Sequence, residues 1–290
     1  MIIALKLKAT VAAVALAAPL FISAGPPAEE PTVRPLQAAA PEMVTLAPGK
    51  IAYRAGGDFA RNGKPANAPQ VTLRVERSLS IMKRQVTAAE YQSCVDAGAC
   101  AALPEASAQG TDRPMVGVSW RDATAYAAWL SQMSGQRFRL PTDEEWAFAA
   151  GSRFRDDAFP EFDGTDPSRR WLARYEEEST RERPGSKQPQ PVGTFGANEH
   201  GLLDLGGNVW EWTNSCFTRG VIEANGEARA SLVNCGVRVV EGAHRTYMTD
   251  FIRDARAGGC AVGTPPSNLG FRLVREADGP LRRLIDWFGV

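Results

Sequence analysis

Residues 201–212, GLLDLGGNVWEW, constrain the fold of this chain more than any other segment. Its three glycines allow backbone angles that residues with a Cβ avoid, so the whole segment fits neither a regular helix nor a regular strand. Asp204, Asn208 and Glu211 add three oxygen-bearing side chains, and a tryptophan stands on each side of Glu211. Tight turns with clustered oxygen atoms suit a hard cation such as Ca²⁺. The alternative is a glycine-rich turn that leads into an aromatic core strand.

The N-terminal residues 1–24 have the organisation of a secretory signal peptide. Lys6 and Lys8 form a basic start, an apolar run follows over 9–22, and the small residue Ala24 offers a cleavage site. The run is too short for a comfortable membrane span, although an uncleaved anchor is the alternative. We therefore predict an exported protein, periplasmic or secreted, that has no membrane contact once the signal peptide is removed.

Composition places the rest of the chain among ordinary globular proteins. The 290 residues are 44% hydrophobic and 23% charged, and their formal net charge is zero. A chain without net charge has no global field to attract nucleic acid or an anionic membrane, so we expect neither as a partner. No repeat and no second hydrophobic core is visible, which indicates a single domain, and we expect a monomer.

The pattern along the chain divides it into four segments. After the signal peptide, residues 25–43 are rich in Pro, Ala and Glu and are predicted to be a disordered lead-in. Residues 44–275 form the predicted α+β domain. Residues 276–290 are a tail with apolar residues at roughly helical spacing, which docks on the core or frays.

Local signals predict short strands and three helices inside this domain. Capping boxes at Thr87, Ser119 and Thr142 each predict the start of a helix, and the second and third helices should end near Gly135 and Gly151. Alternating or apolar runs predict strands, which we place at 44–59 (as strand, turn, strand), 71–82, 237–241 and 271–274.

Export changes how the five cysteines are interpreted, because disulfides persist in oxidising compartments. Cys94 and Cys100 enclose a short loop, and we predict that they pair. Among the other three we favour a bridge between Cys235 and Cys260, which leaves Cys216 buried beside the tryptophans, although the spacing does not decide this connectivity.

Five motifs occur together and in order along the domain. They are PMVGVSWRDATAYAAWLS (114–131), RLPTDEEWAFAAG (139–151), PVGTFGANEHGLLDLGGNVWEW (191–212), HRTY (244–247) and SNLGFRLV (267–274). This series resembles the formylglycine-generating-enzyme, or sulfatase-modifying-factor, family, which includes ergothioneine-type sulfoxide synthases and a periplasmic pyoverdine-maturation branch. The resemblance covers roughly 44–275. It implies a compact fold related to C-type lectins, with little regular secondary structure and a shallow binding cleft.

The resemblance implies one structural calcium ion in the glycine-rich segment. The matching positions are Asp204 and Glu211, which would bind by side chain, and Gly207 and Val209, which would bind by backbone carbonyl. Asp204 replaces a more usual Asn and should bind a cation at least as well. A second calcium site of the family is not recognisable here.

The family's copper site has no match in this chain. Formylglycine-generating enzymes hold Cu(I) with two cysteines spaced five apart, and here Ala243 and Met248 stand at those positions. Soft thiolates suit Cu(I), whereas alanine has no ligand atom and one thioether is a poor substitute. We therefore expect no copper and no genuine formylglycine-generating oxidase activity. With only two histidines, the three-histidine iron site of the sulfoxide synthases is also impossible.

Other positions of the family's cleft are retained. Trp210, Arg256 and Asn268 match residues that line the substrate groove. Glu241 and His244 lie in sequence near the position of the missing copper centre. They are candidates for proton transfer, since a carboxylate beside an aromatic wall can have a raised pKa. The alternative is that Glu241 belongs to an ion-pair network that ties loops together.

Two functions of different classes follow, and the sequence leaves open whether the chain is an enzyme at all. The first is a non-copper maturation oxidoreductase similar to the pyoverdine-maturation branch, acting on a peptide or a peptide-derived small molecule. The second is a catalytically inactive, lectin-like module that binds peptide, glycan or a partner protein. The fold alone does not choose between them, because function depends on the site.

Overall fold

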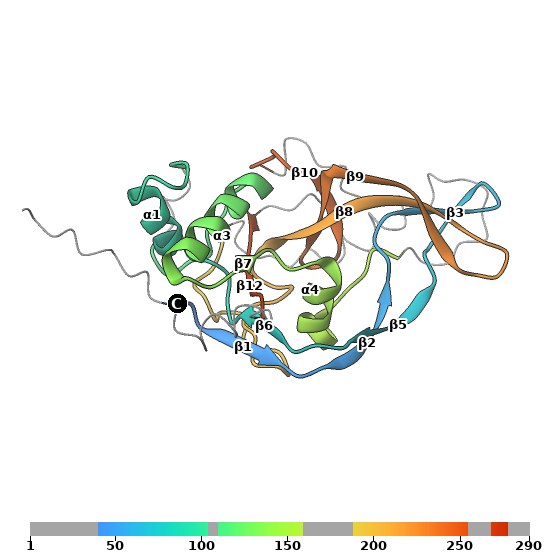
Figure 1. Ribbon diagram of the computed structural model, residues 1–290, viewed down its shortest axis with the longest axis horizontal. Coiled ribbons are helices and arrows are strands. Elements are labelled where there is room, and N and C mark those ends of the chain that lie inside the picture. The colour runs from blue at the N-terminus through green and yellow to red at the C-terminus, as the bar shows by residue number, and fades with distance from the viewer. Residues whose placement is uncertain (1–39, 104–109, 159–187, 255–267, 278–290) are drawn as a thin grey trace, which may run out of the picture. The chain divides into compact units, whose positions relative to one another are not determined.

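The computed structural model in Figure 1 describes four stretches of the chain, which are residues 40–103, 110–158, 188–254 and 268–277. All of them belong to one compact unit that spans Gln37–Val290. The predicted signal peptide, most of the lead-in and the tail from 278 onward lie outside the described residues, and the domain limits of 44–275 stay a prediction. In the described stretches no helix is long and apolar enough to cross a membrane.

The strands of the described stretches form three sheets. A four-stranded sheet has the order β1 (Met43–Leu46), β6 (Leu79–Met82), β12 (Val274–Arg275) and β7 (Phe138–Arg139). A six-stranded sheet runs β10 (Thr246–Thr249), β9 (Ala228–Glu241), β8 (Trp210–Ile222), β3 (Asp58–Arg61) and β4 (Lys64–Ala66), with β11 (Leu269–Gly270) paired to β8. The third sheet pairs β2 (Gly49–Arg54) with β5 (Gln70–Val75).

The three helices predicted from capping boxes are confirmed. They are α1 (Ala88–Asp96), α3 (Trp120–Ser134) and α4 (Asp143–Ala150), and a short 3₁₀ turn, η1 (Gly151–Arg153), follows α4. At each N-terminus the Thr or Ser hydroxyl accepts from the backbone N–H three residues later, and that residue's carboxylate accepts from the cap's own N–H. Gly135 ends α3 in the left-handed conformation, with φ of 66°, which favours glycine.

The described residues form three hydrophobic clusters, and the two largest fill the space between these elements. The larger packs α1 and α3 against Trp212 and Phe271, and the smaller packs Trp146 of α4 against Ile81 of β6. Helix α4 contacts four strands, β2, β5, β8 and β9. The first turn of α4 can therefore contribute side chains to the interior.

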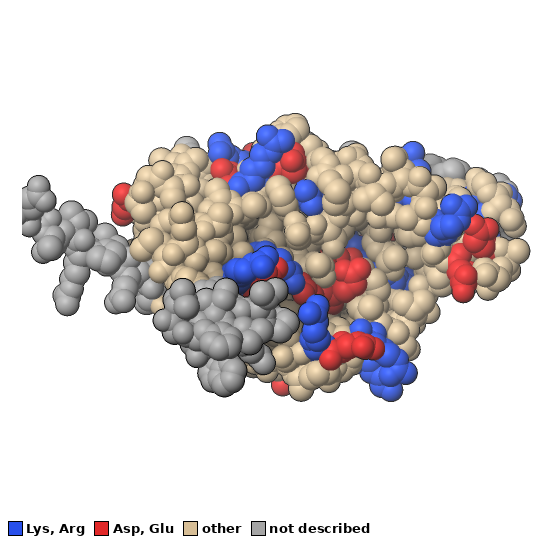
Figure 2. All heavy atoms as spheres, viewed as in Figure 1, with Lys and Arg blue, Asp and Glu red and all other residues tan. Residues whose placement is uncertain are grey.

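Charged residues of both signs lie close together on the face of the molecule seen in Figure 2.

A long hairpin of β8 and β9 dominates the six-stranded sheet, and the sequence prediction missed most of it (Figure 1). Only its last part, 237–241, was predicted as a strand. Asn225 and Gly226 form the turn, in which the Glu223 N–H donates to the Glu227 carbonyl at 2.9 Å. The Asn-Gly pair is a strong hairpin signal and marks where the strands meet.

The other strand predictions were partly correct. The segment 44–59 contains β1, β2 and the start of β3. The single strand predicted at 71–82 is two strands, because β5 and β6 join different sheets. The strand predicted at 271–274 is wrong as placed, since regular pairing is confined to Leu269–Gly270 and Val274–Arg275.

One predicted disulfide is confirmed and the other is wrong. Cys94 is bonded to Cys100, as predicted. Cys235 pairs with Cys216 and not with Cys260, which lies outside the described residues. The hairpin explains the correction, because irregularities in its register place Cys216 and Cys235 opposite each other with their Cα atoms 4.5 Å apart.

Candidate functional site

The side chain of Glu211 is fully buried beneath the glycine-rich turn. Its Oε1 accepts from the Gln85 amide at 2.7 Å and from Arg272 Nη2 at 2.8 Å. Its Oε2 accepts from the Trp146 indole at 2.9 Å and from Arg272 Nε at 2.6 Å. Four N–H donors therefore saturate this carboxylate, and the guanidinium of Arg272 neutralises its charge.

Asp204 closes the turn that precedes this strand. Its backbone has a φ of 60°, in the left-handed region that Asp tolerates better than most residues. One carboxylate oxygen accepts from the Gly193 N–H at 2.6 Å, and the other accepts from the Phe195 N–H at 2.8 Å. Asp204 thus fastens the loop at 193–204 through backbone hydrogen bonds.

The four residues predicted to hold calcium, Asp204, Gly207, Val209 and Glu211, do not fit the ion in this arrangement. Calcium takes six to eight oxygen ligands, and Glu211 has no lone pair left to offer. Arg272 already supplies the positive charge that the ion would bring. Across the described stretches, no group of three or more His, Cys, Asp or Glu side chains converges as metal ligands.

A second buried group is organised around the guanidinium of Arg245. Arg245 Nε donates to Glu241 Oε1 at 2.9 Å, Nη2 lies 3.0 Å from Asp143 Oδ2, and Nη1 lies 3.2 Å from Asp157 Oδ1. Two tyrosine hydroxyls complete the group, since Tyr53 donates to Asp143 and Tyr247 donates to Asp157. We call it the Arg245 cluster, and its members are Tyr53, Asp143, Asp157, Glu241, Arg245 and Tyr247.

Three carboxylates surround one guanidinium in this cluster, so the charges do not balance if all of them ionise. Burial raises the pKa of Glu241 well above its usual range, the charge of Asp143 raises it further, and Arg245 only partly opposes both. The protonated form of Glu241 is therefore favoured. Burial and the neighbouring carboxylates also raise the pKa of Tyr53 and of Tyr247.

Trp210 and His244 form a separate group at the start of β8. Their rings meet edge to face with centroids 5.8 Å apart. Trp210 also lies directly on Gly242, where a Cβ would come within 2.5 Å of the indole. His244 Nδ1 is 2.8 Å from the Arg245 carbonyl, which can only accept, so Nδ1 carries the hydrogen and Nε2 is the acceptor nitrogen of the neutral ring. The backbone carbonyl of Asn268 accepts from the Trp210 N–H at 2.9 Å.

The structure separates the two residues predicted to transfer protons. The carboxylate of Glu241 is sealed inside the Arg245 cluster, with none of its surface exposed. His244 packs on Trp210 instead. Arg256, predicted to line the same groove, lies outside the described residues. Glu241 therefore has the surroundings of the ion-pair network that the sequence offered as its alternative role.

Sequence reasoning missed the residues that neutralise or bury these carboxylates. Arg245 lies in HRTY and Arg272 lies in SNLGFRLV, so both belong to motifs of the family resemblance, which predicts a role for His244 and Asn268 but for neither arginine. Asp143 is the first residue of α4, a favourable position for a carboxylate at a helix N-terminus. A buried arginine needs a partner, and an arginine inside an apolar motif such as LGFRLV was the available signal.

Comparison with known proteins decides the family. The chain matches the model of the sulfatase-modifying factor enzyme 1-like domain over residues 28–277. The chain belongs to this family. The fold prediction is thereby confirmed as a single domain of mixed α+β structure with the formylglycine-generating-enzyme fold and a low helix content.

Related proteins of this family include both active and inactive members. The formylglycine-generating enzyme of Streptomyces coelicolor is 31% identical over 181 residues, which cover 58% of this chain and 54% of that protein. The inactive C-alpha-formylglycine-generating enzyme 2 of Bos taurus is 35% identical over 175 residues, covering 58% of this chain and 52% of that protein. The chain spans about half the length of the curated relatives it matches.

A solved structure supports the same fold. PvdO from Pseudomonas aeruginosa superimposes with a TM-score of 0.51 and 22% sequence identity, covering 82% of this chain and 95% of that one. At this level of identity the similarity concerns the fold alone.

Proposed function

We propose that this chain is an exported, non-copper member of the sulfatase-modifying-factor family, and that it binds a peptide or a peptide-derived small molecule at the surface around Trp210 and His244. The burial of Met248 is the observation that carries the non-copper part of the proposal. Its side chain is 0% exposed and packs in the larger hydrophobic cluster. Ala243, at the other position where the family has a copper cysteine, is exposed and has no ligand atom.

The state of Glu241 favours binding over catalysis in this proposal. A general acid or base must reach the proton that it transfers, directly or through one water molecule. Glu241 is buried among Asp143 and Arg245, whereas Trp210 presents a partly exposed aromatic surface. An aromatic ring beside a histidine suits the recognition of a flat or apolar group. The inactive relative is consistent with a member of the family that has no oxidase activity.

His244 favours a second candidate, the maturation enzyme. Its Nδ1 donates to the Arg245 carbonyl at 2.8 Å, which fixes the ring edge to face with Trp210. A histidine fixed in this way can accept a proton from a bound substrate near neutral pH. A peptide-derived compound that the wild type converts, and that His244→Gln binds without converting, would favour this candidate over the first.

We expect the protein to leave a cysteine substrate unchanged. Cu(I), oxygen and a Cys-x-Pro-x-Arg peptide would be incubated with the protein, and the peptide mass measured. No aldehyde should form above the buffer blank, because two thiolates are needed to hold Cu(I) and neither Ala243 nor Met248 supplies one. Formation of the aldehyde in proportion to protein concentration would contradict the non-copper assignment.

We expect Trp210→Ala to lose the bound ligand. The probe is the low-molecular-mass fraction of a periplasmic extract, passed over immobilised protein and analysed by mass spectrometry. Compounds retained by the wild type should be lost with Trp210→Ala and kept with Leu232→Ala, an apolar control that is 52% exposed on the β8–β9 hairpin. Equal retention by both variants, or no retention by the wild type, would remove this surface as the binding site.

A further inference from the structure

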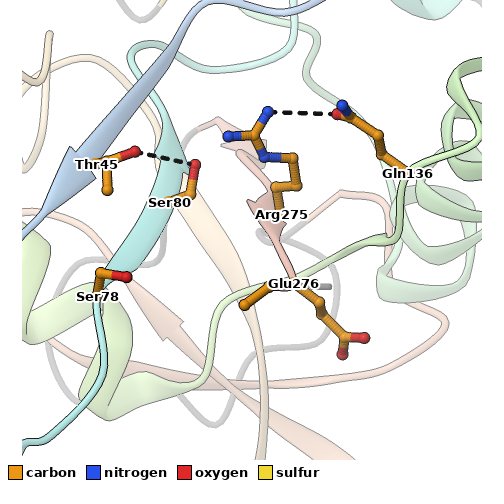
Figure 3. Close-up of a pocket in the computed structure, with 7 residues that line it drawn as sticks. Thr45, Ser78, Ser80, Gln136, Arg275 and Glu276 are labelled. Carbon is orange, nitrogen blue, oxygen red and sulfur yellow. Dashed lines mark hydrogen bonds between the residues drawn. The ribbon is translucent and has the colours of Figure 1, made fainter. Parts of the chain in front are cut away.

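A polar hollow of about 310 Å³ lies on the four-stranded sheet (Figure 3). It is separate from the residues around Trp210 and His244 and from the Arg245 cluster. Hydroxyl, amide and guanidinium groups line most of it, and its residues are Thr45, Ser78, Ser80, Gln136, Arg275, Glu276 and Ala277.

The pairing of three strands explains why these groups converge. Ser80 of β6 is the register partner of Thr45 in β1 on one side and of Arg275 in β12 on the other. Register partners share one face of a sheet, so the three polar side chains form a row across it. Their sequence neighbours Ile81 and Val274 face the opposite side and are buried in the smaller hydrophobic cluster.

The charge of Arg275 is left without a carboxylate partner among the described residues. Within the described stretches its side chain donates from Nη1 to the Gln136 amide oxygen, and at 3.4 Å this is a long hydrogen bond. Figure 3 shows the guanidinium between Ser80 and Gln136, while the carboxylate of Glu276 points away from it. Glu276 pairs instead with Arg137 at 2.8 Å and with Arg139 at 3.0 Å. The acidic group of the hollow is thus neutralised, and one guanidinium remains available.

We propose that this hollow binds an oxyanion, which is a carboxylate, sulfate or phosphate group carried by a small molecule or a chain terminus. The planar fork of Arg275 suits two oxygens of such a group, and hydrogen bonds to an ionised acceptor are stronger than neutral ones. The hydroxyls of Ser80 and Thr45, which lie 3.5 Å apart, donate to the remaining oxygen. Because the hollow lies on hydrogen-bonded strands, the positions of these donors relative to one another are fixed.

The test is calorimetric titration of the full chain with sodium sulfate, sodium phosphate and N-acetylglycine at constant ionic strength. At least one probe should bind saturably with one site per chain. Replacing Arg275 by Gln should weaken that binding about 10- to 100-fold, because a charge-assisted, bidentate interaction is lost. Ser80→Ala should weaken it by less. The preferred probe distinguishes a chain terminus from a sulfate or phosphate ester.

The matched control is Arg229→Gln, because the side chain of Arg229 is 67% exposed and lies on the hairpin outside the hollow. It should bind the probes as the wild type does. Unfolding curves of all variants would establish that each is folded. Equal affinity of the wild type and Arg275→Gln, or the absence of saturable binding for all three probes, would overturn the proposal. Loss of binding in Arg229→Gln as well would reduce it to a general effect of net charge.

Discussion

Replacing Glu211 by alanine is expected to destabilise the protein by about 3–5 kcal/mol, because the buried guanidinium of Arg272 would lose its counter-charge. Both partners are fully buried, so water cannot replace the lost carboxylate. The amide of Gln85 and the indole of Trp146 would lose their acceptors too, and each unsatisfied buried donor adds a further cost. Urea unfolding curves of the wild type and Glu211→Ala measure the difference.

The control for this experiment is an ion pair on the surface. Glu223→Ala removes the partner of Arg229 on the hairpin and should change stability by at most about 1 kcal/mol, since exposed pairs contribute little. A similarly small loss in Glu211→Ala would contradict the importance assigned to the buried pair. Melting curves of the wild type in calcium and in EDTA should coincide. A rise of the melting temperature with calcium would restore the metal site, because a ligand of the folded state stabilises it.

The features that the sequence predicted well are those that depend on neighbouring residues. Each capping box lies within four residues, and the helices that follow Thr87, Ser119 and Thr142 begin where the boxes predict. The loop closed by Cys94 and Cys100 is equally local, with six residues of separation. Local hydrogen bonds and short loops leave few alternative partners, so their outcome was predictable.

Pairing over longer distances was predicted poorly. The bridge of Cys216 to Cys235 depends on the register of a hairpin whose strands had not been recognised. That hairpin does not show a clean alternation of buried and exposed residues, because most of Ala228–Glu241 is exposed on both faces. Only the turn at Asn225 carried a local signal. Without the hairpin, nothing in the sequence connected Cys235 with Cys216 rather than with Cys260.

The candidate site shows the same limit. Resemblance to the family identified Glu211 and Glu241 as important residues, but their roles depend on partners elsewhere in the chain. Glu211 meets Arg272, 61 residues away, and Glu241 shares Arg245 with Asp143, which comes from α4. A carboxylate with free oxygens can bind a metal or move a proton. The same carboxylate surrounded by buried donors stabilises the fold, and the sequence does not contain this distinction.

The second large effect concerns pH and Glu241. The pKa of Glu241 is raised in the folded protein, chiefly by burial and then by the charge of Asp143, whereas the unfolded chain has the ordinary value near 4.5. Above that value the unfolded state has lost the proton and the folded state still holds it, so stability falls as pH rises toward the folded-state pKa. Each such proton changes the unfolding free energy by up to about 1.4 kcal/mol per pH unit.

Glu241→Gln should remove this dependence, because glutamine keeps the shape and the acceptor for Arg245 but never ionises. Relative to the wild type, the variant should therefore become more stable as pH rises from 5 to 8, by about 1 kcal/mol or more over that interval. The control is Glu145→Gln. Burial, the largest single influence, raises the pKa of Glu145, but the hydrogen bonds from Arg139 and the Thr142 N–H, together with the charge of Arg139, outweigh burial and lower it, so that difference should stay flat above pH 5. Urea unfolding at each pH provides the measurement. A constant difference between the wild type and Glu241→Gln would mean that Glu241 is ionised in the folded protein, and that Arg245 balances its charge more completely than the charges of the cluster indicate.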